Sequence, residues 1–99
     1  MARYDVFANP SGSGLLLDVQ TDLLSGLNTR VVVPLLARDV APAPAERLNP
    51  VLEVDGAEMV MVTQFMAAVP LAILKMPLGN LGDDFDRIAL AIDMLMQGF

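Results

Sequence analysis

The sequence predicts a single-domain α+β protein, residues 1–99, with mainly antiparallel strands followed by one C-terminal helix. In the first half, short apolar segments alternate with clusters of Gly, Pro, Asn and Ser, as strands alternate with turns. The dipeptide Asp55-Gly56, typical of a tight hairpin turn, separates two further segments of this kind. Residues 83–97 contain no Gly or Pro and repeat apolar residues at helical spacing, which predicts the helix.

The first part of the chain predicts three strands, over residues 3–8, 15–20 and 30–36. The third is rich in β-branched valine, and Pro34 should either stop it or place it at a sheet edge. Residues 9–14 and 21–29 form the connections. Ser11-Gly12-Ser13-Gly14 lacks the Lys-Ser/Thr or the third glycine of a nucleotide-binding loop, so we interpret it as a plain turn.

A hairpin is predicted over residues 50–54 and 58–63, joined through Asp55-Gly56. Alternation places apolar side chains on both of its faces, so we expect it to be central or covered on both sides. Met59 and Met61 are interpreted as core residues, although methionines also serve as adaptable binding surfaces.

The rest of the β region gives a weaker pattern. Residues 37–49, which include two prolines, show neither helical nor strand periodicity and stay unassigned. A sixth strand is expected at residues 71–75, followed by a glycine-marked turn over 78–82.

The C-terminal helix is expected over residues 83–97, ended by Gly98. Asp83 and Asp84 fall where the helix dipole favours negative charge, and Asp83 can pair with Arg87 one turn later. Helix-start electrostatics therefore explains these aspartates, with Asp86, better than a metal or acid–base site does.

The apolar residues of this helix cover more than one face. At about 100° per residue, one stripe is expected to face the core: Phe85, Ile88, Ala89, Ile92 and Met96. Leu90 and Met94 fall on nearly the opposite side, where they fit a homodimer interface, a contact with another partner, or both. A narrow polar stripe separates the two: Asp86, Asp93 and Gln97.

Composition narrows the function. The formal net charge of -6, with six scattered basic residues, argues against direct binding to nucleic acid. The chain contains no His and no Cys, which removes the commonest general base and the strongest nucleophile. No apolar run reaches membrane-spanning length and no secretory signal is visible. We expect a cytoplasmic, non-enzymatic protein without cofactor, metal or membrane contact, and its 55% hydrophobic content favours association with other chains.

Several motifs together resemble one known family. They are residues 17–24 (Leu-Asp-Val-Gln-Thr-Asp-Leu-Leu), residues 31–35 (Val-Val-Val-Pro-Leu), residues 49–56 (Asn-Pro-Val-Leu-Glu-Val-Asp-Gly), then Thr63, Met66, Val69-Pro70, Ala91-Ile92 and Gly98. In order and spacing they resemble the CcdB family of plasmid-addiction toxins, which poison DNA gyrase. The resemblance spans nearly the whole chain.

This resemblance implies an SH3-like β-sheet of the CcdB type with one C-terminal helix, assembled as a homodimer. It implies binding to the gyrase A subunit, trapping of the enzyme on cleaved DNA, and neutralisation by a CcdA-like antitoxin. By resemblance, the gyrase contact would be Asp93, Met96, Gln97, Gly98 and Phe99. We assign the antitoxin contact to Thr21, Asp22, Leu23 and Leu24, and the dimer contact to Leu90 and Met94.

The chain departs from the family at its end. A tryptophan-glycine-isoleucine ending carries the gyrase contact in the family, and here the corresponding residues are Gln97, Gly98 and Phe99; Asp93 replaces an asparagine. One alternative is therefore a protein of this fold that binds only an antitoxin or another topoisomerase. A ribonuclease toxin of similar fold ranks lower, because the chain offers neither a basic RNA path nor a histidine.

Overall fold

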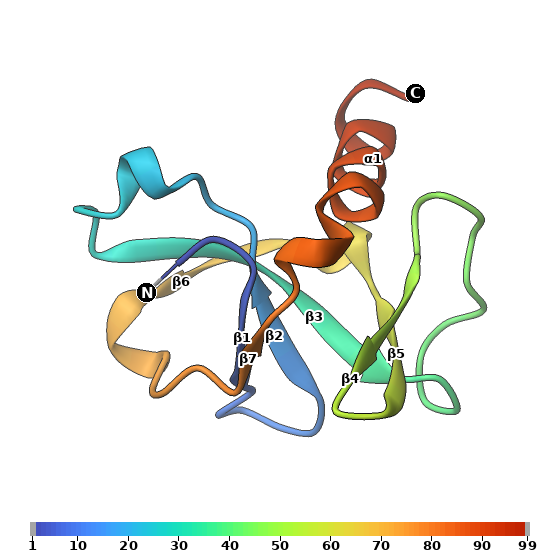
Figure 1. Ribbon diagram of the computed structural model, residues 1–99, viewed down its shortest axis with the longest axis horizontal. Helices are drawn as coiled ribbons and strands as arrows, with labels where there is room; N and C mark the ends of the chain where they lie inside the picture. The colour runs from blue at the N-terminus through green and yellow to red at the C-terminus, as the bar shows by residue number, and fades with distance from the viewer. Residues whose placement is uncertain (1, 99) are drawn as a thin grey trace.

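The computed structural model describes residues 2–98. Over this range one curled antiparallel sheet of seven strands packs against a single α-helix, α1 (Phe85–Gln97), as Figure 1 shows. The strands are β1 (Asp5–Ala8), β2 (Leu15–Asp18), β3 (Thr29–Ala37), β4 (Val51–Val54), β5 (Ala57–Met61), β6 (Ala67–Pro70) and β7 (Gly79–Asn80). The predicted fold class is confirmed. Within residues 2–98, no helix combines the length and the apolar character that crossing a bilayer requires.

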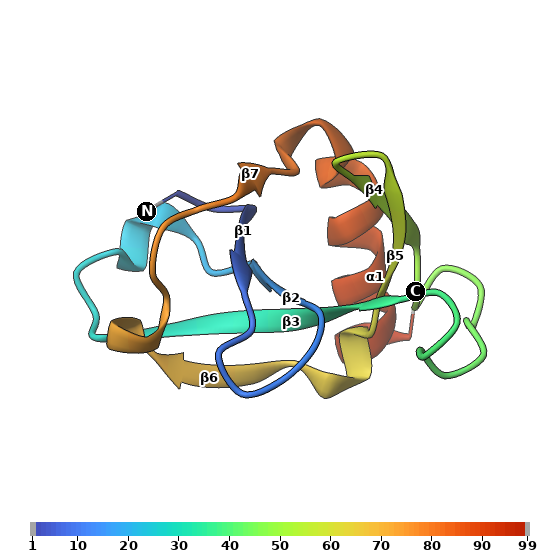
Figure 2. The ribbon, with the colours of Figure 1, turned by 90° about the horizontal axis from the view of Figure 1, so that it is seen from below.

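Strand β3 is the longest and lies in the middle of the sheet (Figure 2). Along one edge it pairs with β2, and along the other it pairs first with β6 and then with β5. Pro34 lies where the second edge changes partner, and its carbonyl oxygen accepts a hydrogen bond from Val62 N at 3.0 Å. The expectation that Pro34 stops the strand or marks a sheet edge was wrong: its missing N–H is tolerated because neither β5 nor β6 pairs with the strand there.

The predicted hairpin is confirmed as β4 and β5. Asp55 and Gly56 both have positive φ angles, 51° and 82°, as a two-residue type I′ turn requires. Met59 and Met61 are buried in the core, as interpreted from the sequence. Val60 points to the other face and is buried too, so the hairpin is covered on both sides.

Two apolar clusters lie on opposite faces of the sheet. The larger fills the space between the sheet and α1: Val6, Leu17, Val19, Val33, Leu35, Leu52, Met59, Met61, Leu81, Ile88 and Ala91. The smaller contains Phe7, Leu16, Val32 and Leu74. Neighbouring residues of β1, β2 and β3 divide between the clusters because side chains alternate along a strand.

The strand predicted at residues 71–75 is wrong. Residues Leu71–Ile73 form the short 3₁₀ helix η3, and the strand lies just before it, as β6. The N–H of Leu71 still bonds to the carbonyl of Asn28 at 2.8 Å, beyond the last paired residues of β3 and β6. The turn predicted over 78–82 contains the two-residue strand β7, which pairs with β1.

Helix α1 follows the 3₁₀ turn η4 (Gly82–Asp84) and ends at Gly98, which has a φ of 82°. The side facing the core is centred on Ile88 and Ala91, with Ile92 half-buried. The predicted core stripe was therefore partly wrong, because the helix is rotated so that Phe85 and Met96 stay 53% and 64% exposed.

The predicted pair at the start of this helix also needs correction. The ion-pair partner of Arg87 is Asp84, at 3.6 Å, rather than Asp83. Arg87 also donates a hydrogen bond to the carbonyl of Val51 at 2.7 Å, which ties the helix to strand β4.

Replacing Gly14 with alanine should destabilise the fold by about 1–3 kcal/mol. Gly14 has a φ of +89°, and a Cβ there would lie 2.6 Å from the carbonyl oxygen of Leu35. Gly12 is the matched control, because its Cβ would meet no atom within 4 Å. Urea unfolding of Gly14→Ala and Gly12→Ala measures the difference, and equal stabilities would contradict the predicted clash.

Candidate protein-binding surfaces

The C-terminal end of α1 carries the residues assigned to gyrase binding. In Figure 1 this end of the helix points away from the sheet. Asp93, Met96, Gln97 and Gly98 are all exposed, and they lie on one side of the last helical turns. The N–H of Gly98 bonds to Met94 O at 3.1 Å, which fixes the direction in which the chain leaves the helix. Phe99, the fifth predicted residue, lies outside the described residues.

Leu90 and Met94, predicted as a dimer contact, lie beside this end of the helix. Leu90 is 50% exposed and Met94 is half-buried. At about 100° per residue they adjoin Gln97 and Asp93 on the helix surface. Leu90 and Met94 thus form an apolar strip that adjoins the C-terminal surface.

The residues assigned to the antitoxin form a second surface, the η1 surface, at the other end of the molecule (Figures 1 and 2). Asp22–Leu24 form the 3₁₀ helix η1, and the Thr21 hydroxyl accepts a hydrogen bond from Leu23 N at 3.4 Å. Leu23 is 92% exposed, Leu24 48% and nearby Leu27 49%. Three exposed leucines in one short segment are typical of an interaction surface.

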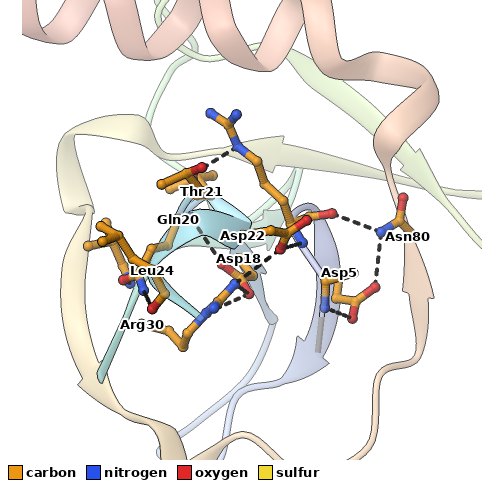
Figure 3. A network of polar contacts seen from close by, with 12 residues as sticks. Asp5, Asp18, Gln20, Thr21, Asp22, Leu24, Arg30 and Asn80 are labelled. Carbon is orange, nitrogen blue, oxygen red and sulfur yellow. Dashed lines mark hydrogen bonds and ion pairs between the residues drawn. The ribbon is translucent and has the colours of Figure 1, made fainter. Parts of the chain in front are cut away.

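A buried ion pair supports the η1 surface from below (Figure 3). Asp18 Oδ2 accepts two hydrogen bonds from Arg30, at 2.5 Å from Nη2 and 2.9 Å from Nε. Both side chains are nearly inaccessible to solvent, with 0% and 1% exposure. The second oxygen of Asp18 accepts the N–H of Gln20 at 3.0 Å. Arg30 Nη2 also lies 3.9 Å from the Asp22 carboxylate, so the pair reaches directly into η1.

Gln20 and Asp22 extend this network to the neighbouring backbone (Figure 3). The Gln20 amide donates to Leu24 O at 3.1 Å and accepts from Val31 N at 3.1 Å, which links η1 to β3. The Asp22 carboxylate accepts the N–H of Arg3 at 2.8 Å. Side-chain hydrogen bonds therefore hold the exposed leucines on a defined backbone.

The pKa of the Asp18 carboxyl is raised above its ordinary value because burial disfavours the charged form. Hydrogen bonds from Arg30 and from the Gln20 N–H act in the opposite direction without reversing this. The ion pair is thus costly to bury, and it is kept together because each partner would cost more to bury alone.

Sequence reasoning missed this pair. The sequence contained one indication of the pair. Asp18 follows three leucines and Arg30 precedes three valines, so residues of opposite charge flank the apolar segments of two neighbouring strands. Charged residues are seldom fully buried, so this pattern alone would not have placed both residues in the interior.

Comparison with known proteins identifies the family. The family model described as CcdB protein matches residues 3–98, nearly the whole chain. The chain belongs to the CcdB family. It is therefore a CcdB-like toxin of the toxin–antitoxin class, in which the family acts as a poison of gyrase rather than as an enzyme. The curled antiparallel sheet and the C-terminal helix α1 are consistent with a CcdB-type fold.

Proposed function

We propose that this CcdB-family protein binds the gyrase A subunit through the C-terminal end of α1 and traps gyrase on cleaved DNA. The family match over residues 3–98 is the observation that carries the proposal. The exposure of Asp93, Met96 and Gln97 supports it, because a docking surface must be free in the unbound protein. Met96 supplies an apolar contact, while Asp93 and Gln97 supply hydrogen-bonding groups beside it.

Two further contacts belong to this proposal. An antitoxin neutralises the toxin at the η1 surface, and the three exposed leucines there support an apolar contact with it. A second copy of the chain packs on Leu90 and Met94, supported by the 50% exposure of Leu90 on a helix whose opposite side faces the core.

A ribonuclease remains the weaker alternative. Arg30 would be the basic residue of such a site, but its side chain is 1% exposed and paired with Asp18. A buried, neutralised guanidinium is poorly placed to bind an RNA phosphate. This observation favours a protein-binding toxin over an RNA-cleaving one.

A gyrase cleavage assay with the purified protein tests the proposal. We expect micromolar protein to stabilise double-strand breaks in plasmid DNA, and we expect expression in a gyrase-competent cell to arrest growth. A resistant gyrase A variant should relieve that arrest, and so should the cognate antitoxin. Unhindered growth without trapped breaks would instead favour the alternative suggested by Gln97, a CcdB fold that has lost gyrase poisoning.

A further inference from the structure

A pocket of about 220 Å³ lies between α1 and the segment that leads into β4, away from the η1 surface and adjoining the C-terminal surface only at Leu90. Its lining combines two arginines with two apolar residues: Arg47, Pro50, Arg87 and Leu90. In a chain with six basic residues and a net charge of -6, two arginines at one pocket are a local reversal of charge. The pocket therefore favours an anionic group with an apolar neighbour.

Arg47 is presented by a firmly held turn. It has a φ of 70°, an unfavourable backbone conformation for a residue with a side chain. Buried Asn49 exchanges hydrogen bonds with Ala45, at 2.9 and 3.0 Å, and donates to Met61 O at 3.1 Å. Buried Thr63 bonds to Leu48 O at 2.5 Å. These contacts from both sides keep Arg47 at the pocket, since strained positions persist only where the surroundings hold them.

Arg87 is fixed from the other wall. Its Nη2 donates to Val51 O at 2.7 Å, and its Nη1 lies 3.6 Å from Asp84. A guanidinium carries five N–H donors, so these two contacts leave donors for an incoming carboxylate. Asp84 offsets part of this charge, whereas Arg47 takes part in no ion pair or side-chain hydrogen bond found within residues 2–98.

We propose that this pocket binds an acidic peptide segment of a protein partner. A carboxylate side chain of the segment lies between Arg47 and Arg87, and a neighbouring apolar side chain packs on Pro50 and Leu90. The two arginines favour an acidic segment because their charges are opposite to it. Elsewhere on this acidic protein, the net negative charge would repel such a segment.

The proposal goes beyond gyrase binding and does not depend on it. Leu90 also belongs to the proposed dimer contact, so a second copy of the chain is the competing occupant. Molar mass measured by light scattering separates the two: if Arg47→Gln turns a dimer into a monomer, the pocket is filled by a second copy and the proposal is overturned.

The binding test starts from short random peptides displayed on phage and selected on the wild-type protein. We expect the enriched peptides to share an Asp or Glu beside a large apolar residue. For a synthetic copy of one such peptide, Arg47→Gln or Arg87→Gln should weaken binding roughly 10- to 100-fold, as expected for losing a charged hydrogen bond. Replacing the peptide's acidic residue by its amide should weaken binding to the wild type more than binding to Arg47→Gln, in which only Arg87 still faces the carboxylate.

Arg38→Gln is the matched control. Arg38 is also an exposed arginine, with 58% of its side chain accessible, but it pairs with Glu58 and does not line the pocket. Its substitution should leave peptide affinity within about two-fold, since exposed ion pairs contribute little. Enriched peptides without acidic residues would overturn the proposal, and so would unchanged affinity in both pocket variants.

Discussion

Asp18→Asn should lower the free energy of unfolding by about 3–5 kcal/mol, the usual cost of removing one partner of a buried ion pair. The substitution leaves Arg30 buried at 1% exposure, with only the exposed carboxylate of Asp22, 3.9 Å away, as a counter-charge, and an arginine cannot escape by losing its proton. A domain of this size has roughly 5–15 kcal/mol of stability in total, so a large part of it would be lost. Urea unfolding followed by circular dichroism measures the effect.

Glu58→Gln is the matched control for Asp18→Asn, because it makes the same carboxylate-to-amide change in an exposed pair, Arg38–Glu58. Its effect should stay below about 1 kcal/mol. The double variant Asp18→Leu, Arg30→Met should recover most of the lost stability, since burial raises the pKa of Asp18 and thus already opposes its charged form. Equal losses in Asp18→Asn and Glu58→Gln would contradict this account of the buried pair.

Gln97→Trp should strengthen binding to gyrase A by roughly 30-fold to 1000-fold, corresponding to the ~2–4 kcal/mol of a buried aromatic anchor. The family's gyrase contact has a tryptophan at the position that Gln97 occupies. Gln97 is exposed at the end of α1, so the larger ring can be added without disturbing the core. Calorimetric titration of a gyrase A fragment measures the gain, and trapped DNA breaks should appear at lower protein concentration.

Leu23→Trp provides the control for the added ring. Leu23 is 92% exposed on the η1 surface, at the other end of the molecule, so Leu23→Trp exposes the same indole ring away from α1. Its gyrase affinity should match that of the wild type. If both variants bind gyrase A equally tightly, the gain comes from non-specific apolar binding of the added ring and the proposed docking mode is wrong.

The sequence predicted those parts of the fold that local chemistry determines. Asp55-Gly56 set the hairpin, since few other residue pairs adopt two positive φ angles easily. The Gly- and Pro-free repeat of residues 83–97 predicted α1, and Gly98 its end. Strand β6 was missed because Ala67–Pro70 is short and carries no alternation; long-range pairing with β3 is what makes it a strand. The apolar run at residues 71–75 was ambiguous for the same reason.

The candidate surfaces were predicted less completely than the fold. Resemblance indicated the end of α1, where Asp93, Met96, Gln97 and Gly98 are exposed; in the segment separately assigned to the antitoxin, Asp22, Leu23 and Leu24 are exposed and Thr21 is half-buried. Periodicity could not fix the rotation of α1, because apolar residues cover most of its circumference; packing of Ile88 and Ala91 against the sheet decides it. The pocket at Arg47 and Arg87 brings together residues 40 positions apart, a proximity that only the folded chain provides.

Pro34 has a consequence for the newly synthesised chain. Strands β1, β2 and β3 precede β5 and β6 in sequence, so the edge of β3 that later receives them is open first. A long open strand rich in valine is a template for pairing with other chains. Because a proline offers no N–H, Pro34 interrupts that edge near its middle while β5 and β6 are still absent. We therefore expect Pro34, which the finished sheet tolerates, to lower the tendency of the growing chain to aggregate.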